Sequence, residues 1–394
     1  MKKFLDLGLQ PLANSYIKKK SIKLNEKKFK LVVGFNPKNY LVSILNTVPK
    51  EKMFNKDYPY KSSESKTMQK SFMDLARKLK KIYKPKFVIE IGSNDGAFIK
   101  NFNRNVVVGV EPCKNLARIT QKQNYKTYAE YWSPKLSQKI TKNKKADLIY
   151  SANTLSHIKN FNEIFKAIEY ALSNKGILIL EDPSLLECLK NGAYDQFYCE
   201  HIYVFSTIAL EKVLKKFNLE IFDVKNLLTH GGSLRYFIKR KINKKINVKI
   251  SVKKQLSKEI KFGLNKFSIY KNFGDMVKRS KYNLLKIFDR LKKKNKKIIG
   301  YGATAKASTV LNYCNIGNET IDYFVDTTPN KFNRFIPGKN IKIKRYKKIL
   351  LNKVDYVFLG AWNFKNEIFN KEKAFISNGG KFIVHVPLPR IINK

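Results

Sequence analysis

The chain has 394 residues, a formal charge of +50, 43% hydrophobic and 13% aromatic residues. This length is too great for one ordinary core and predicts two or three domains, and the hydrophobic content excludes a disordered chain. Only ten of the 80 basic residues are arginines, and the lysines are spread along the whole chain. The charge therefore indicates compositional drift rather than dedicated nucleic-acid binding, for which clustered arginine is typical.

The cysteines and the first residues bear on the compartment. Four cysteines lie far apart without a C-x-x-C pair, at Cys113, Cys188, Cys199 and Cys314. This spacing indicates neither a disulfide framework nor a zinc ribbon, and fits a reducing, cytoplasmic setting. Residues 1–13 lack the apolar stretch of a signal peptide, and no run approaches 18 uninterrupted apolar residues. We therefore expect neither secretion nor a transmembrane segment.

The predicted elements change character along the chain. Short apolar runs at 29–33 and 40–45, separated by turn signals, predict a small N-terminal domain of strands and turns. Helical spacing of apolar residues follows from 71 to 82. Candidate buried strands then alternate with helical stretches, at 87–91, 106–110, 146–150 and 176–181. The alternation predicts an α/β unit with a parallel sheet and helices on both faces.

The last part of the chain repeats this pattern. Five apolar residues between 239 and 297 fall on one helical face: Phe273, Val277, Leu284, Phe288 and Leu291. Candidate strands follow at 297–300, 321–325, 354–360 and 381–386. We therefore expect helices and then a second Rossmann-like α/β unit.

The strongest motif is an E-x-G-x-x-x-G pattern that closes the strand at 87–91 and comprises Glu90, Gly92, Ser93, Asn94 and Gly96. Glycines let the backbone approach a ligand, and a helix expected to begin near residue 97 would present free N–H groups to it. Glu111, followed by Pro112, ends the next strand, where a carboxylate can accept both ribose hydroxyls of an adenosine. The glycine spacing favours S-adenosylmethionine (SAM) over NAD, and hence a methyltransferase.

Polar residues after the later strands are candidates for the reaction. Asn153 and His157 follow the strand at 146–150, where open α/β sheets face their ligands. The N-P-P-Y box of amino-methylating nucleic-acid enzymes is absent there, which favours a small-molecule substrate. His201 lies close to Tyr198 and Glu200, and a histidine beside a carboxylate is the usual arrangement of a general base that works near neutral pH.

Two glycine-containing segments are candidates for anion binding. His230, Gly231, Gly232, Ser233 and Arg235 combine paired glycines with a hydroxyl and an arginine, although a simple β-turn would need the glycines alone. The later segment with Tyr301 and Lys306 resembles a phosphate loop, and we assign it to the substrate pocket.

Together these motifs resemble the SAM-dependent C-methyltransferases that act on nucleotide-linked (TDP) keto-deoxysugars. The likeness spans nearly the whole chain, through segments at 7–14, 57–65, 90–96, 153–157, 198–201, 230–235, 301–306 and 361–363. It implies a small N-terminal domain (1–75), a central methyltransferase domain (76–238) and a C-terminal helical and Rossmann-like domain (239–394), with the sugar nucleotide held between the last two.

The resemblance also implies a mechanism. His201 would remove the proton on the carbon next to the sugar ketone, and the enolate would attack the methyl group of SAM. Five further residues match positions around the sugar and the reacting methyl: Tyr60, Asn153, His157, Tyr198 and Glu200. Neutral donors such as histidine, asparagine and tyrosine suit a developing enolate oxygen.

The sequence departs from the family at two places. Relatives bind a structural zinc through two C-x-x-C pairs, but this chain begins after the position of the first pair, and Asn36 and Asn39 stand at the second. We therefore predict no zinc. The family's Tyr-His-Glu-His segment carries Cys199 in place of its first histidine, while His201 is kept.

Two other hypotheses remain open from the sequence. An O- or N-methyltransferase of another small molecule needs no deprotonated carbon, so His201→Ala would leave it substantial activity. A catalytically degenerate methyltransferase fold could serve as a binding protein, with nucleic acid as one ligand of its basic surface. Such a protein would fail to bind SAM at about 1 mM.

Overall fold

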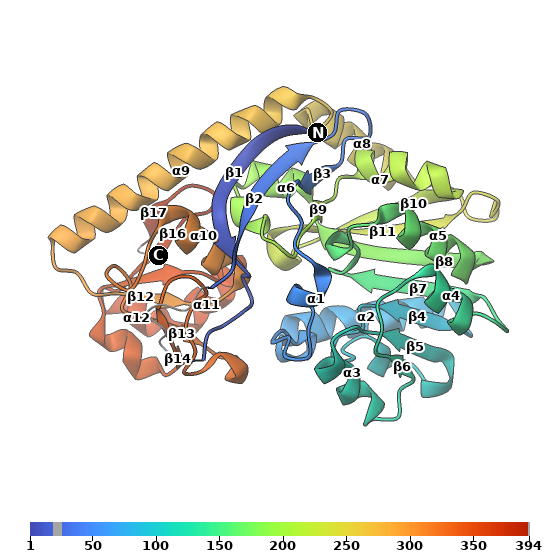
Figure 1. Cartoon of the computed structure of the whole chain (residues 1–394), viewed down its shortest axis with the longest axis horizontal. Helices are drawn as coiled ribbons and strands as arrows, with labels where there is room; N and C mark the ends of the chain where they lie inside the picture. The colour runs from blue at the N-terminus through green and yellow to red at the C-terminus, as the bar shows by residue number, and fades with distance from the viewer. Residues whose placement is uncertain (19–25, 393–394) are drawn as a thin grey trace.

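The computed structural model describes residues 1–18 and 26–392, which form three β-sheets (Figure 1). The N-terminal sheet contains β1 (Lys2–Pro11), β2 (Lys28–Phe35), β3 (Val42–Ile44) and β9 (Tyr203–Val204). The central sheet contains β4 (Val88–Ile91), β5 (Val107–Val110), β6 (Thr127–Tyr128), β7 (Ala146–Ala152), β8 (Leu172–Pro183), β10 (Leu219–Leu227) and β11 (Ser233–Arg240). The C-terminal sheet contains β12 (Ile298–Tyr301), β13 (Tyr323–Asp326), β14 (Lys342–Arg345), β15 (Tyr356–Leu359), β16 (Lys381–Val384) and β17 (Arg390–Ile392).

The helices of the N-terminal and central parts are α1 (Lys50–Met53), α2 (Lys66–Tyr83), α3 (Lys114–Gln121), α4 (Pro134–Ile140), α5 (Phe161–Ala171), α6 (Leu185–Lys190) and α7 (Thr207–Leu214). The C-terminal part carries α8 (Ile250–Phe262), α9 (Phe267–Lys293), α10 (Ala305–Cys314), α11 (Lys365–Lys371) and α12 (Lys373–Ser377). The five apolar residues predicted on one helical face all lie buried on α9.

The central sheet has the order β10-β11-β8-β7-β4-β5-β6, and β11 alone runs antiparallel to its neighbours. Successive residues of a strand face opposite sides. Val88 therefore packs with α2, whereas Ile89 and Ile91 pack with α5 and α7 on the other side. Because both faces are covered, the strands read as continuous apolar runs, as the sequence predicted.

The C-terminal sheet has the order β14-β13-β12-β15-β16-β17, with only β17 antiparallel. Its four inner strands are the four predicted from the sequence. The α/β fold class is therefore confirmed: two Rossmann-like units and a small N-terminal part. Figure 1 shows the C-terminal unit on the left and the central unit on the right, with β1 and β2 between them.

The N-terminal sheet contacts both the central unit and the C-terminal unit. Its fourth strand, β9, comes from the central unit, and Val42 pairs with Val204. Its first strand, β1, packs against α9 and α10 of the C-terminal unit. The ring of Phe4 contacts the rings of Phe197, Tyr270 and Phe273. The N-terminal strands therefore share a core with both larger units.

The prediction that a helix begins near residue 97 is wrong. After Gly96 the chain forms only the short 3-10 helix Ile99–Asn101. The side-chain amide of Asn101 donates hydrogen bonds to the carbonyls of Ala97 and Phe98, at 3.0 and 2.9 Å. These carbonyls would be the acceptors of a continuing helix, so the asparagine side chain competes with helix formation.

Two further observations concern membranes and metals. Within residues 1–18 and 26–392, no helix is long and apolar enough to cross a membrane, and no cluster of three or more histidine, cysteine or acidic side chains is placed to hold a metal. The amide oxygens of Asn36 and Asn39 accept hydrogen bonds from backbone N–H groups two residues further on. Such turns need no metal, and the absence of zinc stays a prediction.

Candidate active site

A cavity of about 920 Å³ lies where the three parts of the chain meet. The carboxyl ends of β4, β5 and β7 open into it, as do those of β12 and β13, which is where α/β sheets bind ligands. Thirteen of the predicted site residues line it: Tyr60, Glu90, Gly92, Asn94, Glu111, Pro112, Asn153, His157, Tyr198, His201, His230, Tyr301 and Lys306.

The residues predicted to bind the cofactor converge at the ends of β4 and β5. Glu111 is buried, and its two oxygens accept the backbone N–H groups of Asn94 at 2.9 Å and Cys113 at 2.8 Å. Burial raises the pKa of Glu111 above its usual value, although the two hydrogen bonds act to lower it. A carboxylate oxygen has a second lone pair, so Glu111 can still accept hydroxyl groups of a ligand.

Two further features fit an adenosine-containing cofactor at this place. Gly92 has a φ of +78°, and a Cβ atom there would lie 2.1 Å from Thr154 Oγ1, so only glycine suits this close turn. Glu90 Oε2 is buried and has no hydrogen-bond partner among the described residues. An orphaned buried acceptor beside a cavity indicates a ligand with donors.

Glu111→Ala is expected to weaken SAM binding by roughly 10- to 100-fold, because hydrogen bonds to a charged group are worth about 1.5–3 kcal/mol. Isothermal titration calorimetry measures this change. Glu130→Ala removes a half-exposed carboxylate that pairs with Lys139 at 3.5 Å, and we expect it to leave the affinity unchanged. Equal affinities for the native protein and Glu111→Ala would contradict the assignment.

The N-terminal part is hydrogen-bonded to the loop that follows β4, at residues 92–96. The backbone N–H of Ser62 donates to Asn94 Oδ1 at 2.9 Å, and that of Ser63 to Asp95 Oδ1 at 3.2 Å. The Ser63 hydroxyl bonds the other Asp95 oxygen, and the amide of Asn94 donates to the Tyr60 carbonyl at 3.2 Å. These contacts hold Tyr60 at the cavity wall.

The candidate base is held at both ring nitrogens. Nδ1 of His201 lies 2.8 Å from the carbonyl oxygen of Gln196, which can only accept, so Nδ1 carries the proton. Nε2 lies 2.5 Å from the Tyr198 hydroxyl. Burial, with the nearby His157 and Lys306, lowers the pKa of His201 well below 6.5. His201 is therefore neutral near pH 7, with its free nitrogen toward Tyr198.

Other polar residues surround this pair. His157 stacks between the rings of Phe54 and His201, at centroid distances of 5.5 and 5.1 Å. Its Nε2 is buried without a partner within the described part of the chain, and burial lowers its pKa to about 4. Asn153 lies 3.3 Å from Nε2 of His230. Burial, with Lys306, lowers the pKa of His230 to about 3, so neutral groups line this part of the cavity.

Glu200 was expected around the sugar, but it does not line the cavity. Its two oxygens accept hydrogen bonds from Asn14 at 2.8 Å and from the Tyr58 hydroxyl at 2.9 Å. Burial raises the pKa of Glu200 to about 7, although the two hydrogen bonds act to lower it. The side chain points away because the turn that brings Tyr198 and His201 to the cavity directs Glu200 toward the N-terminal part.

Four of the five residues predicted to form an anion cradle at 230–235 do not line the cavity. The guanidinium of Arg235 is buried, 2.5 Å from the carboxylate of Glu181. A Cβ at Gly231 would meet the ring of Trp362 and one at Gly232 would meet Glu187, so both glycines serve close packing. Ser233 Oγ donates to the Thr229 carbonyl at 3.0 Å. Only His230 of this segment reaches the cavity.

Two residues of the cofactor motif also lie outside the cavity lining. Gly96 has a φ of +85°, and a Cβ there would lie 2.5 Å from Thr120, so this glycine is required for packing. Ser93 is buried, and its hydroxyl lies toward Gly109 of β5. They shape the loop rather than the ligand surface.

Sequence reasoning missed several lining residues: Phe54, Met68, Phe72, Tyr131, Trp132, Asp326 and Lys331. The aromatic and apolar ones carry no motif. Asp326, however, ends β13, and the rule that sheets bind ligands at the carboxyl ends of their strands could have found it. Its Oδ2 accepts the backbone N–H of Ala303 at 2.8 Å and lies 3.3 Å from the Lys331 ammonium.

A Rossmann-like sheet that brings a tight glycine turn and an acidic residue together at the ends of its first two strands is an arrangement that binds adenosine-containing cofactors, of which SAM is one. Three family models match the chain in order: a zinc binding domain at 1–54, a methyltransferase domain at 64–224 and the C-methyltransferase C-terminal domain at 228–387. The chain is 28% identical to C-methyltransferase NovU of Streptomyces niveus, over 99% of this chain and 94% of NovU. The chain is a SAM-dependent C-methyltransferase.

Solved structures resemble part of the chain. A SAM-dependent methyltransferase from Clostridium acetobutylicum aligns with 44% of this chain and 92% of its own, at 14% identity and a TM-score of 0.34. Magnesium protoporphyrin IX methyltransferase (ChlM) from Synechocystis PCC 6803, solved with SAM, aligns with 44% of this chain and 79% of its own, at 14% identity and a TM-score of 0.33.

Proposed function

We propose that this C-methyltransferase acts on a nucleotide-linked keto-deoxysugar, at the carbon next to the ketone, with His201 as the general base. The observation that carries the proposal is the Tyr198–His201 pair, which lines the same cavity as the predicted cofactor residues: a neutral imidazole whose unprotonated nitrogen is paired with the Tyr198 hydroxyl. Similarity to NovU over almost the full length supports C-methylation. We keep the three predicted domains, 1–75, 76–238 and 239–394, as part of this proposal.

The residues of this chain divide the work as follows. Glu90, Gly92, Asn94, Glu111 and Pro112 hold the cofactor. SAM supplies the electrophilic methyl group that the carbon nucleophile takes up. Alignment of the two reactants is then the main requirement for the transfer.

The proton step needs a base and a stabilised enolate. The C–H bond next to the ketone breaks, its proton goes to Nε2 of His201, and the electron pair moves to the ketone oxygen. Burial, with Glu200 nearby, raises the pKa of Tyr198 well above 10, so its hydroxyl stays protonated. In the proposed step this hydroxyl turns from Nε2 to the ketone oxygen, where it donates, and the lone pair of Nε2 takes the substrate proton. His157 and Asn153 supply neutral polar groups beside the developing enolate oxygen.

The C-terminal unit supports binding of the rest of the substrate. Lys306 is buried at the cavity, and its ammonium donates to the His230 carbonyl at 3.1 Å, which leaves further N–H donors free for an anionic group. Tyr301 lines the same wall. All four cysteines are buried free thiols, which supports the reducing, cytoplasmic setting expected from the sequence.

The test is proton exchange in deuterium oxide, followed by NMR, with the native protein and a TDP-keto-deoxysugar. We expect the proton next to the ketone to exchange only in the presence of the enzyme. With ¹³C-methyl SAM, the label should appear on the sugar carbon that exchanged. Label on oxygen or nitrogen, or neither exchange nor transfer with several keto-sugars although SAM binds, would reject the proposed substrate and mechanism.

A further inference from the structure

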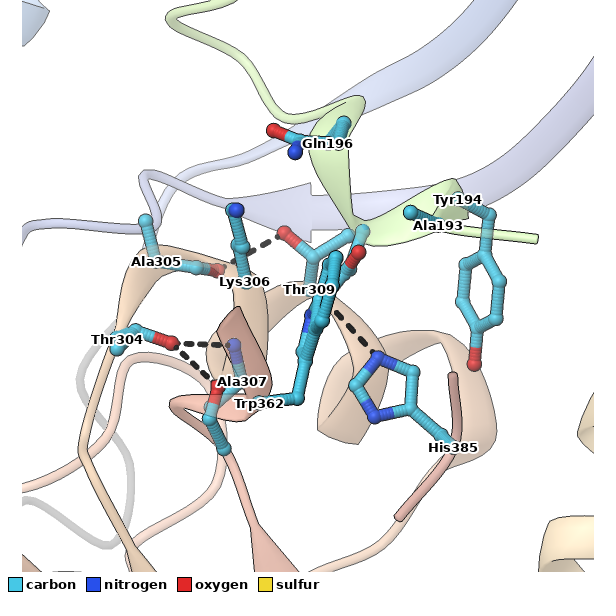
Figure 2. A network of polar contacts seen from close by, with 12 residues as sticks. Ala193, Tyr194, Gln196, Thr304, Ala305, Lys306, Ala307, Thr309, Trp362 and His385 are labelled. Atoms are coloured by element: carbon cyan, nitrogen blue, oxygen red, sulfur yellow. Dashed lines mark hydrogen bonds and ion pairs between the residues drawn. The ribbon is translucent and has the colours of Figure 1, made fainter. Parts of the chain in front are cut away.

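A buried carboxylate connects the central and C-terminal units behind the candidate base. Asp195 lies in the 3-10 helix Tyr194–Gln196 of the central unit and is 0% exposed. Its Oδ2 accepts hydrogen bonds from Trp362 Nε1 at 2.6 Å and from His385 Nε2 at 3.0 Å. Figure 2 shows Trp362 and His385 of the C-terminal unit beside the turn that carries Tyr194 and Gln196.

These partners keep the carboxylate ionised. Burial alone would raise the pKa of Asp195, but His385, Lys306 and Trp362 hold it below its ordinary value. All three partners belong to the C-terminal unit. A buried charge that loses its partners is strongly destabilising, so Asp195 fixes its turn only where the C-terminal unit is in contact with it.

The next residue along the chain, Gln196, carries the connection to the base. Its carbonyl accepts the Nδ1 proton of His201 at 2.8 Å. Its side-chain amide donates to the His230 carbonyl at 2.6 Å, which also accepts from Lys306 at 3.1 Å. The C-terminal unit therefore holds this turn on two sides, through Asp195 and through the His230 carbonyl.

We propose that Asp195, held by Trp362 and His385, is a positioning residue that fixes the tautomer of His201. When the Gln196 carbonyl is in place, the imidazole proton stays on Nδ1, and Nε2 keeps the lone pair that can accept a proton. When the turn shifts, the proton can move to Nε2, and the imidazole loses its function as a base. The catalytic consequence rests on the function proposed above, whereas the tautomer itself does not.

The direct test is NMR of protein labelled with ¹⁵N-histidine, because the chain contains only four histidines and His201→Gln identifies the signal of His201. We expect the native protein to show the Nδ1–H tautomer. Asp195→Ala should give a mixture with the Nε2–H form, as should Trp362→Phe, which removes one donor and keeps a ring. Asp195→Asn retains an oxygen acceptor and should restore the native tautomer.

A matched control is Asp223→Asn. Asp223 is also buried and accepts two hydrogen bonds, from Lys249 at 2.9 Å and Ser251 at 2.7 Å, but it lies on β10 and does not line the cavity. We expect it to leave the His201 signals unchanged. A native His201 spectrum in folded Asp195→Ala and Trp362→Phe overturns the proposal, as does an Nε2–H tautomer in the native protein.

Kinetics separate this proposal from the proposed function. Asp195→Ala should lower kcat for methyl transfer by roughly 10- to 100-fold, the cost of a misplaced catalytic group, with the KM for SAM unchanged. A lower kcat with a native His201 tautomer would contradict positioning. If His201→Gln is itself fully active, the proposed base is wrong, and the NMR comparison still decides whether Asp195 sets the tautomer.

Discussion

A His201→Gln variant is expected to exchange the substrate proton and transfer the methyl group roughly 10²- to 10⁴-fold more slowly than the native enzyme, because glutamine has no basic nitrogen to replace Nε2. SAM affinity should be unchanged, since His201 bonds Tyr198 and Gln196 rather than the cofactor residues. Proton exchange measured by NMR and SAM binding measured by calorimetry, on the same sample, check both statements.

The pH profile gives an independent check on this variant. The imidazole accepts a proton only when neutral, and the pKa of His201 is lowered well below 6.5. In the native enzyme the part of the rate that depends on His201 should therefore persist at pH 6.5 and fall as the pH drops through this lowered pKa. The variant should lack this acid limb. An identical limb in both proteins would place the base at another residue.

Arg235→Met is expected to lower the free energy of unfolding of the central unit by about 3–5 kcal/mol, because it leaves the Glu181 carboxylate buried without its cation. Glu181 is 3% exposed, and its Oε1 accepts both the Arg235 Nε–H and the Tyr150 hydroxyl, the latter at 3.0 Å. Urea denaturation followed by circular dichroism measures this loss.

A second substitution separates charge burial from lost packing. Adding Glu181→Gln to Arg235→Met removes the unpaired charge and keeps an amide oxygen for Tyr150, so most of the lost stability should return. Were Arg235 instead a substrate ligand, the single variant would keep its stability and bind the nucleotide sugar more weakly. The single variant therefore also tests whether Arg235 takes part in the predicted anion cradle.

The sequence predicted those parts of the fold in which one local pattern has one structural solution. Buried parallel strands need continuous apolar runs, so the strands that became β4, β7, β12 and β15 could be recognised. Gly92 and Glu111 could be placed because the ends of adjacent parallel strands meet, whatever the rest of the chain does.

Contacts that depend on strand register or on distant segments were not predictable in this way. Arg235 faces Glu181 only because β11 pairs with β8 in the register that puts these two residues opposite each other. Trp362 donates to Asp195 across 167 positions of the chain. The direction of the Glu200 side chain depends on the orientation of a short turn, which cannot be predicted from the spacing of apolar residues. Arg235 and Glu200 depart from the predicted site at such contacts.

The pairing of β3 with β9 has a consequence for synthesis of the protein on the ribosome. The sheet that contains Val42 is complete only after Val204 has been synthesised. At a synthesis rate of about 5–20 residues per second, the intervening chain takes roughly 8–30 s to make. During that time β3 presents an open edge, which is a template for aggregation. A nascent chain that stops before residue 204 therefore lacks the strand that protects this edge.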